Sequence, residues 1–414
     1  MPGHRLGEVI VMVTSSYPRF PGDSVGTFME PIATSIAARG HLVHVVAPWH
    51  PRVARRPVEH GVHFHFYKYA PLESLNVFGY AEGMRADVRL RRTAMAAAPL
   101  ALAAGWRAAR KVARKYQATI MHGHWVVPGG VTAAVASPRV PLVISLHGSD
   151  VFVAERFAPA RAAARLAFRR AAYVTACSED LAVRAIALGA PRDRTVVIPY
   201  GVDADRFRPS AAARVEFRSR NRIPPDVPLI AAAGRLVSKK GFEYLIDGLP
   251  RIDGAVVALA GDGTLRDELE RRASQAGVAD RVVFLGNRSQ DDVSALFASA
   301  DVIATPSVRD ESGNVDGLPN VVMEALASGT PLVTTTAGGI GAVVENETTA
   351  IVVPEKDASA LADALTRALT DAALRERLGV AARRLVQERF GWARTAERFE
   401  DVYRRALVCS PPAR

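Results

Sequence analysis

Cysteine is almost absent from this chain of 414 residues, in which only Cys177 and Cys409 occur. Two thiols cannot form the disulfide framework of a small secreted domain, and such scarcity is typical of proteins from a reducing cytoplasm. Long apolar runs are absent as well. The longest, at 94–106, contains Pro99 and falls short of the ~18–20 residues that span a bilayer. We therefore expect a cytoplasmic protein without a transmembrane helix.

The N-terminal segment MPGHRLGEVIVMVTSSYP also lacks the pattern of a secretory signal. Its apolar run has roughly six residues, fewer than the ~7–15 of a signal-peptide core. Because the run is short, apolar throughout and followed by polar residues, we interpret it as the first buried strand of a sheet.

Lysine is scarce in an otherwise basic chain, with six lysines among 53 basic residues and a net charge of +11. A basic surface attracts phosphate groups, whether in nucleic acid, anionic lipid or a diphosphate substrate. An Ala- and Arg-rich composition can equally reflect coding bias. The chain lacks a platform of interleaved basic and aromatic residues, so we expect no nucleic-acid partner.

Short apolar segments are abundant, and they alternate with longer alanine-rich segments of helical pattern. Runs of this kind, followed by Gly, His or Ser, are typical of parallel strands buried on both faces. The alternation predicts an α/β fold with doubly wound sheets, in which ligands bind beyond the carboxyl ends of the strands. The predicted strands are EVIVMVTS, HLVHVVAP, ATIMHGHW, PLVISLHG, AAYVTACS, TVVIPYGV, PLIAAAGR, AVVALAGDG, RVVFLGN, DVIATPS, TPLVTTT and AIVVP.

The strand pattern is interrupted at GVDADRFRPSAAARVEF, where the density of charge rises. Because 414 residues exceed what one hydrophobic core organises, we predict two Rossmann-like domains, at 1–207 and 208–390. The segment FGWARTAERFEDVYRRAL has the pattern of an amphipathic helix, and we expect residues 391–414 to pack back on the first domain. Only the tail SPPAR is expected to be disordered.

A glycine is missing where a dinucleotide-binding fingerprint would require one. In AVVALAGDGTLRDELE a strand is followed by Gly261 and Gly263, but Arg266 occupies the position of the third glycine. A dehydrogenase is therefore disfavoured. The turn at Gly263 still places backbone amides at a helix N-terminus, which is a usable anion site, although a plain turn needs no ligand.

Three cations follow the predicted strand PLIAAAG, namely Arg235, Lys239 and Lys240. Burying a cation costs several kcal/mol unless it is paired. We predict that Arg235 and Lys240 neutralise a diphosphate, arginine with a bidentate fork and lysine as a point charge. The alternative is a solvated cationic turn.

Two acids bracket a predicted helix start within VRDESGNVDGLPNVVMEALASG. Proline suits the first turn of that helix, and the final glycine suits its end. Glu324, about one turn inside, is placed to accept hydrogen bonds from ribose hydroxyls, and Asp316, before the turn, from a sugar. Glu311 is a rival acid with a different spacing. The backbone at the helix start should face the ligand, over Gly317, Leu318, Pro319, Asn320 and Val321.

The spacing Asp316-x7-Glu324, the ending EALASGTPLVTTTAGG and the upstream GRLVSKKG together resemble the E-x7-E signature of glycosyltransferase family 4. The N-terminal half agrees. SSYPRFPGDSVGTFMEPIATSIAARGH resembles the family's glycine loop, with Gly26 as the close-approach glycine, and HGHWVVPGG and SLHGSD resemble two further strand-end loops. The resemblance covers nearly the whole chain. It departs from the family pattern at Asp316, which is shorter than the family's first glutamate.

The resemblance implies a role for each motif of the second half. Arg235 and Lys240 would contact the diphosphate, while Glu324 would contact the ribose. Asp316 would contact the donor sugar, and the backbone of 317–321 would enclose the sugar and the diphosphate. The turn at Gly263 would still be a candidate anion site. Arg288, in the loop 286–288, would line the nucleotide base.

In the first half, the resemblance implies that His147 faces the donor sugar. His122 and His124 are candidates for either acceptor-loop or packing roles. Asp150 either orients His147 or caps the next helix, and we favour the cap.

Members of the family are retaining, metal-independent enzymes of the GT-B fold. The resemblance implies a hexosyltransferase that uses a nucleotide-diphosphate sugar and a glycan or lipid-linked acceptor, in the synthesis of cell-surface polysaccharide or glycoconjugate. We expect no cofactor and no metal; the string Asp203-Ala-Asp205 is interpreted as structural. The alternatives are a sugar-nucleotide epimerase and a non-catalytic nucleotide-sugar binding module. A phosphorylase with pyridoxal phosphate is disfavoured, because none of the six lysines has a convincing Schiff-base site.

The acceptor is expected to bind the first domain. There, the segment 84–115 has an Ala/Leu middle with many cations, which would suit peripheral contact with an anionic membrane. An ordinary helix pair with cationic flanks is the alternative that we favour. The cations are Arg85, Arg89, Arg91, Arg92, Arg107, Arg110, Lys111, Arg114 and Lys115.

Overall fold

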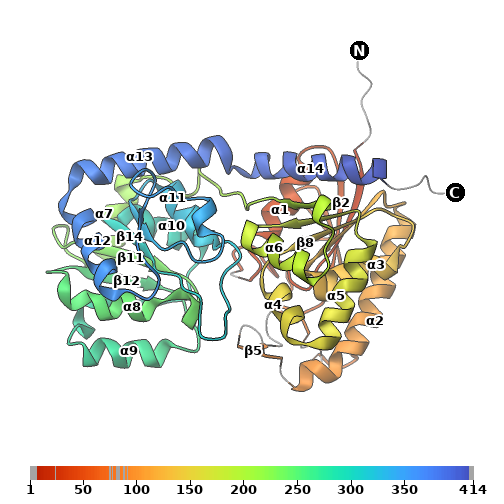
Figure 1. The fold of residues 1–414 in the computed structure, drawn as a ribbon, viewed down its shortest axis with the longest axis horizontal. Coiled ribbons are helices and arrows are strands. Elements are labelled where there is room, and N and C mark those ends of the chain that lie inside the picture. Colours follow the sequence, from red (N-terminus) through yellow and green to blue (C-terminus); the bar gives the residue numbers. More distant parts are fainter. Residues whose placement is uncertain are drawn as a thin grey trace, which may run out of the picture. The chain divides into compact units, whose positions relative to one another are not determined.

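In a computed structural model, residues 7–409 are described apart from 24, 74, 75, 77, 81–83, 87, 88 and 91, with the backbone alone at 84–86, 89, 90 and 92–96. The tail expected to be disordered, 410–414, lies outside the described residues, as does Arg91, and the side chains of Arg85, Arg89 and Arg92 are not described. The chain forms two compact units, Met1–Pro199 with Trp392–Arg414, and Tyr200–Gly391. Each unit is an α/β layer structure (Figure 1).

The first unit is built on a sheet with the strand order β10-β9-β8-β7-β1-β2-β4-β3. Its strand pairs are parallel except β3 with β4. Every apolar run predicted as a strand in this half is present, whereas β3 and β4 were not predicted. The strands are β1 (Val9–Val13), β2 (Leu42–Pro48), β3 (Val58–Glu59), β4 (Val62–Tyr67), β7 (Ile120–His124), β8 (Leu142–Leu146), β9 (Tyr173–Ala176) and β10 (Thr195–Val197).

Helices cover both faces of this sheet. Helix α14 (Trp392–Cys409) packs against α1 (Met29–Ala37) and buries Phe399, Val402 and Tyr403. The other face is covered by α2 (Arg92–Lys115), α3 (Val131–Ala136) and α5 (Ala158–Arg170) (Figure 1).

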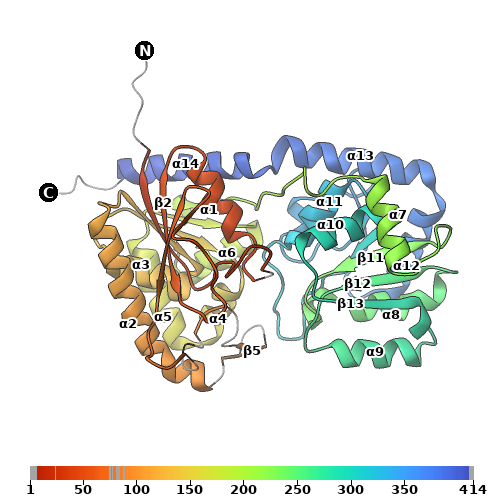
Figure 2. The ribbon, with the colours of Figure 1, turned by 180° about the vertical axis from the view of Figure 1, so that it is seen from behind.

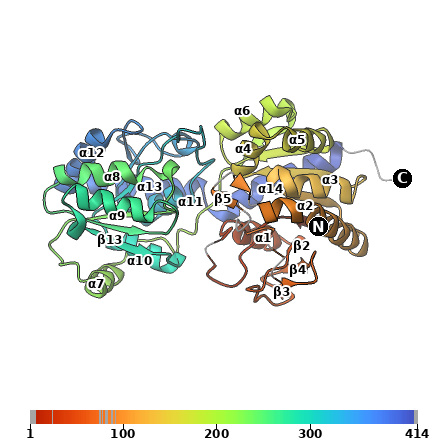
Figure 3. The same cartoon turned by 90° about the horizontal axis from the view of Figure 1, so that it is seen from below.

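The edges of the first sheet differ in their covering. Viewed from below in Figure 3, β2, β4 and β3 lie toward one edge, and α6 (Glu179–Leu188), which contacts β9 and β10, lies toward the other. Helix α4 (Ser149–Arg156) follows β8 directly.

A separate antiparallel pair of strands lies outside this sheet and consists of β5 (Met84–Ala86) and β6 (Arg89–Leu90).

The second unit is built on a fully parallel sheet with the order β13-β12-β11-β14-β15-β16. Its strands are β11 (Leu229–Ala233), β12 (Val256–Ala260), β13 (Val282–Gly286), β14 (Val302–Thr305), β15 (Leu332–Thr334) and β16 (Ile351–Val352), and all were predicted. One face carries α8 (Phe242–Gly248), α9 (Arg266–Gln275) and α12 (Ala358–Thr370) (Figure 2). The other carries α7 (Ala211–Arg220), α10 (Gln290–Ser299), α11 (Asn320–Ser328) and α13 (Ala372–Arg389).

The strand order creates a topological switch point in each unit. From β11 the chain winds outward through β12 and β13, and then returns to β14 on the other side of β11. In the first unit β1 lies between β2 and β7 in the same way. Crevices at the carboxyl ends of such strands are where open α/β sheets bind ligands, which directs attention to the loops after β11 and β14 and after β1 and β7.

The boundary between the units lies earlier than the sequence suggested, at Pro199 and Tyr200 instead of 207 and 208. The segment 200–207 is packed into the second unit. Phe207 is buried with its ring 6.4 Å from that of Phe297, and its carbonyl accepts a hydrogen bond of 2.9 Å from Arg383. The charged residues that suggested a linker are therefore part of the second unit's surface.

Candidate active site

A carboxylate between two lysines lies at the switch point of the second unit. Nζ of Lys239 is 3.0 Å from Oδ1 of Asp316, and Nζ of Lys240 is 2.6 Å from Oδ2. The lysines follow β11 and the acid follows β14, so neighbouring strands deliver them to one place. The structure thus brings together Lys240 and Asp316, which the sequence predicted, and adds Lys239.

Glycines fix the loops that carry these side chains. Gly241 has a φ of +67°, and a Cβ there would lie 1.9 Å from the carbonyl oxygen of Pro306. Gly338 has a φ of +61°, and a Cβ there would lie 2.0 Å from the carbonyl oxygen of Asp316. No L side chain fits either position. Together with the hydrogen bond from Val308 N–H to the Lys239 carbonyl, 2.9 Å, these contacts join the loops after β11, β14 and β15.

The two lysines keep Asp316 ionised. Burial alone would raise the pKa of its carboxyl group, but the charges of Lys239 and Lys240 act more strongly together and lower the pKa well below its usual range. The acid therefore accepts hydrogen bonds and does not act as a proton donor near neutral pH.

Glu324 lies on α11 and belongs to a different network. Its Oε1 accepts a weak hydrogen bond of 3.4 Å from Gln290, whose amide oxygen accepts one of 2.6 Å from Arg206. Burial raises the pKa of Glu324 to about 7, and the hydrogen bond from Gln290 with the charges of Lys240 and Arg206 only partly opposes this. A carboxyl group with this pKa changes its charge near neutral pH.

The start of α11 has one buried polar atom without a partner among the described residues. The helix begins at Asn320, and Pro319 caps it in an extended conformation, so the proline precedes the first turn in which the sequence had placed it. Gly317 and Leu318 are buried, and Val321 is half-buried. Within the part of the chain that the structure describes, Oδ1 of Asn320 is buried without a hydrogen-bond partner. The helix dipole and the backbone N–H groups of the first turn make this end of α11 suitable for an anion, although the N–H of Val322 already donates to the Pro319 carbonyl at 3.1 Å.

The remaining predicted residues of the second unit have less specific surroundings. Arg235 is exposed, directly after Gly234 at the end of β11. Gly263 packs against the backbone of Leu236, where a Cβ would lie 2.5 Å from the carbonyl oxygen. That contact alone explains the need for glycine there. Arg288 is half-buried in the loop between β13 and α10.

In the first unit, His147 belongs to a partly buried aromatic cluster at the end of β8. Its Nε2 is 3.1 Å from Nδ1 of His124, and its ring lies 4.7 Å from those of Phe28 and Trp125. Burial, with a smaller effect from His124, holds the pKa of His147 well below its usual value. The imidazole is therefore neutral, a hydrogen-bonding group without charge. Gly26, with a φ of +64°, lies in the turn before α1, where a Cβ would come within 3.1 Å of Ser16 Oγ.

Asp150 joins two strand-end loops. Its carboxylate accepts hydrogen bonds from the backbone N–H groups of Val126, at 2.8 Å, and Gly148, at 3.0 Å. The favoured prediction of a helix cap was wrong, because Gly148 is the N-cap of α4 and no described side chain caps this helix. Asp150 instead holds the loop after β7 to the loop after β8, and it also accepts a hydrogen bond of 3.3 Å from the backbone N–H of His147. His122 is fully buried between Tyr403 on α14 and Ser145 on β8, at 2.7 Å from each, which gives it a packing role.

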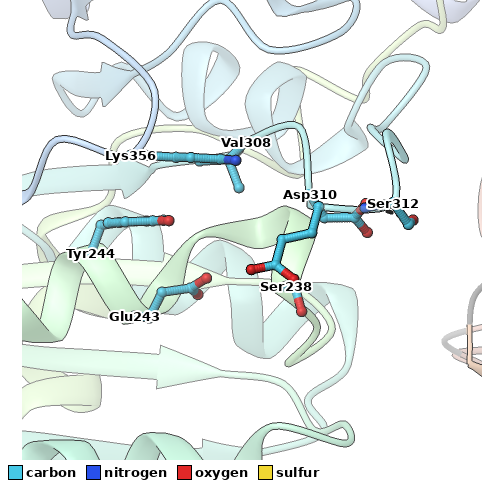
Figure 4. A pocket seen from close by; sticks show the side chains of 8 residues that line it. Ser238, Glu243, Tyr244, Val308, Asp310, Ser312 and Lys356 are labelled. Carbon is cyan, nitrogen blue, oxygen red and sulfur yellow. Dashed lines mark hydrogen bonds between the residues drawn. The ribbon is translucent and has the colours of Figure 1, made fainter.

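Glu311, the rival acid, lines a cavity of about 430 Å³ in the second unit, which Ser238 and Val308 also line. Figure 4 shows Lys356, Tyr244 and Glu243 extending from one side of this cavity toward Asp310. Asp310 is fixed within its own loop, since its Oδ1 accepts hydrogen bonds from the backbone of residues 312 and 314.

Sequence reasoning assigned no role to three residues of the site. Lys239 was named with Arg235 and Lys240 but received no role, because the sequence alone does not distinguish two adjacent lysines. Gln290 and Arg206 come from segments far from Glu324 in sequence. Only the capping pattern Ser289-x-x-Asp292 marks the start of α10 and hence the position of Gln290.

The Asp203-Ala-Asp205 string forms a turn. Oδ1 of Asp203 accepts hydrogen bonds from the N–H groups of Asp205, at 3.1 Å, and Arg206, at 2.9 Å. Among the described residues, no group of three or more His, Cys, Asp or Glu side chains is placed to hold a metal ion.

The two-unit architecture is that of known glycosyltransferases. Sucrose-phosphate synthase from Thermosynechococcus elongatus superposes with a TM-score of 0.79 at 21% identity, over 98% of this chain and 100% of its own. The Anabaena protein HepE, in complex with UDP, gives a TM-score of 0.75 at 21% identity, over 95% of this chain and 98% of its own. At such identities the likeness shows the fold, and the fold is GT-B.

Sequence relatives define the family. The model described as Glycosyltransferase Family 4 matches residues 25–206, and that of Glycosyl transferases group 1 matches 213–385. A GDP-mannose-dependent alpha-(1-6)-phosphatidylinositol monomannoside mannosyltransferase from Mycobacterium tuberculosis is 30% identical over 411 residues, which cover 95% of this chain and 98% of the relative. The chain belongs to glycosyltransferase family 4 and is a hexosyltransferase.

Proposed function

We propose that this hexosyltransferase moves a hexosyl unit, with retention of configuration, from a nucleotide-diphosphate sugar to a glycan or lipid-linked acceptor. The observation that carries the proposal is the convergence of Lys240, Asp316 and the start of α11 at the switch point of the second unit. The group combines cations for a diphosphate with a carboxylate for a sugar. The full-length relative, named as dependent on GDP-mannose, supports a donor of this class.

The residues of the second unit act on the leaving group. Glycosyl transfer passes through an oxocarbenium-like state, and negative charge grows on the departing diphosphate. Lys240, Arg235 and the amides of α11 supply fixed positive potential where that charge develops. Glu324 accepts hydrogen bonds from the ribose, and Asp316 from the donor sugar. Gly263 and Arg288 would contribute at the diphosphate and the base. We propose no metal and no other cofactor.

The loops of the first unit are proposed to meet the donor sugar and the acceptor. His147 offers a neutral imidazole, and Gly26 lets the backbone approach the ligand closely. Because the pKa of His147 is far below neutrality, its contribution is a hydrogen bond and not a positive charge.

We also propose that α2 contacts the membrane that holds a lipid-linked acceptor. The helix buries Ala101, Ala109 and Val112 and exposes Arg107 and Lys111. Such a cationic face is attracted to anionic lipid. Within the described residues, no helix has the length and apolar character needed to cross a bilayer. Sedimentation with liposomes that contain or lack anionic lipid tests the contact; equal binding to both, at any salt concentration, would refute it.

A screen of nucleotide sugars by thermal shift, followed by hydrolysis and transfer assays on the hits, tests the function. The proposal predicts that one nucleotide sugar raises the melting temperature and is slowly hydrolysed without an acceptor. Interconversion of sugars without release of nucleotide would identify an epimerase. Binding without any turnover, across a panel of acceptors, would identify a binding module. NMR of the product's anomeric configuration tests retention.

A further inference from the structure

Asp316 is paired with two ammonium groups, although one would neutralise it. Lys239 faces Oδ1 at 3.0 Å and Lys240 faces Oδ2 at 2.6 Å, so each carboxylate oxygen has its own cation. Two lysines and one aspartate carry a net charge of +1. The second cation therefore exceeds what the carboxylate needs.

The proposed function, on which this inference rests, makes two demands on Lys240. Its ammonium must contact the diphosphate, and it must also neutralise Asp316. A buried carboxylate that loses its counter-ion is strongly destabilised. With Lys240 alone, each diphosphate contact would be made at the expense of the acid that binds the donor sugar.

We infer that Lys239 is a positioning residue that stays paired with Asp316 and so releases Lys240 for the diphosphate. The two lysines differ in their surroundings, although both side chains are largely buried. Lys239 is 7% exposed, and its carbonyl is fixed by the N–H of Val308 on the loop that leads to Asp316. Lys240 runs across the turn after β11, where its Cε would lie 3.4 Å from a Cβ built at Gly234. The backbone of Lys239 is therefore bonded to the loop that carries the acid, whereas the side chain of Lys240 follows the turn after β11, where the diphosphate is proposed to bind.

The test is a comparison of nucleotide affinities by isothermal titration calorimetry. The probes are GDP and UDP, with GMP and UMP as monophosphate partners that lack the β-phosphate. The variants are Lys239→Met, Asp316→Asn and the double variant. Lys356→Met serves as a matched control, since this lysine belongs to the same unit and lines the cavity beside Glu311 without an ion pair to Asp316 among the described residues.

In Lys239→Met, Lys240 should remain held by Asp316, so that affinity for the diphosphate falls roughly tenfold, as for the loss of one close charge partner. Monophosphate affinity should change by less than about threefold, because the β-phosphate is the group that Lys240 meets. Removing the carboxylate as well, in the double variant, should restore diphosphate affinity to near that of Asp316→Asn. The control should bind like the wild type.

A purely structural role for Lys239 predicts a different pattern. Equal losses for diphosphate and monophosphate, or a double variant as weak as Lys239→Met, would overturn the inference. If Lys239→Met does not fold, Lys239→Gln, which keeps a donor but no charge, carries the same comparison. Failure of the wild-type chain to bind either diphosphate would instead refute the proposed function itself.

Discussion

At the scale of single residues, the site works by placing charges of opposite sign on neighbouring strand ends. Asp316 could be chosen from the sequence because its spacing to Glu324 matches a family signature. The role of Lys239 could not, because only the backbone of the turn at 238–241 brings both adjacent lysines to the same carboxylate. Likewise, nothing in the sequence near Glu324 reveals Gln290, which the fold brings to it from α10.

Removal of either proposed phosphate-binding cation should impair the chemical step. Arg235→Ala and Lys240→Ala are each expected to lower turnover roughly 100-fold, the order of effect seen when one charge-stabilising donor is lost. Single-turnover kinetics with saturating donor would measure it. Turnover that survives the loss of both side chains would refute their role, and Lys356→Ala is a control of the same residue type.

The raised pKa of Glu324 predicts a pH dependence of nucleotide binding. In the free protein this carboxyl group has a pKa of about 7 instead of 4.5 because it is buried. Ribose hydroxyls donate to the charged form, so affinity should be full above about pH 7 and fall by up to tenfold per pH unit below it. Calorimetric titration between pH 5.5 and pH 8.5, values chosen around that pKa of about 7, would show it. A flat profile in the wild type, equal to that of Glu324→Gln, would contradict the assignment.

The same pKa has the opposite effect on stability. A folded-state pKa above the unfolded value of 4.5 means that the folded chain holds the proton more tightly. Glu324 therefore contributes stability that is fully present below about pH 4.5 and is lost as the pH rises through about 7. At neutral pH and above, the charged form of Glu324 is available to bind ribose, but it lowers the folding stability of the protein.

At the scale of elements, the predicted strands are all present, because continuous apolar runs report strands buried on both faces. Strand β4, VHFHFY, was not predicted, because it alternates histidines with apolar residues and lies near the edge of its sheet. The helix from Asn320 was predicted to within one residue of its start, since proline and glycine mark its ends. Loop contacts, in contrast, could not be predicted, because they join segments that are distant in sequence.

A substitution at Gly338 would test whether the contact between the loops after β14 and β15 keeps Asp316 in position. Gly338→Ala would place a Cβ 2.0 Å from the Asp316 carbonyl oxygen, so the loop of the acid must move. We expect loss of most transfer activity, with a lower melting temperature. Gly254→Ala is a matched control, since Gly254 has a φ of +62° but open space around its Cβ position. Both variants carry the cost of about 1 kcal/mol for an L residue in this conformation, and only the first should lose activity.

At the scale of the whole molecule, the alternation of strands and helices specified two doubly wound units, and the family resemblance specified their order. The domain boundary was predicted eight residues too late in the chain, because the charged segment 200–207 has the composition of a linker. The buried side chain of Phe207 nevertheless packs this segment into the second unit. The central claim concerns the second unit alone. Its strand order brings the loops after β11 and β14 together, and those loops are proposed to hold the diphosphate.

Hydrogen–deuterium exchange with and without a nucleoside diphosphate, compared with the matching monophosphate, tests that claim most directly. The account predicts that the diphosphate slows exchange in peptides covering 234–241 and 316–324, and that the monophosphate protects them less. Lys240→Ala should remove the difference between the two ligands. Protection confined to the first unit, or to residues 243–244, 310–312 and 356 around the cavity, would show that the diphosphate binds elsewhere and would contradict the account.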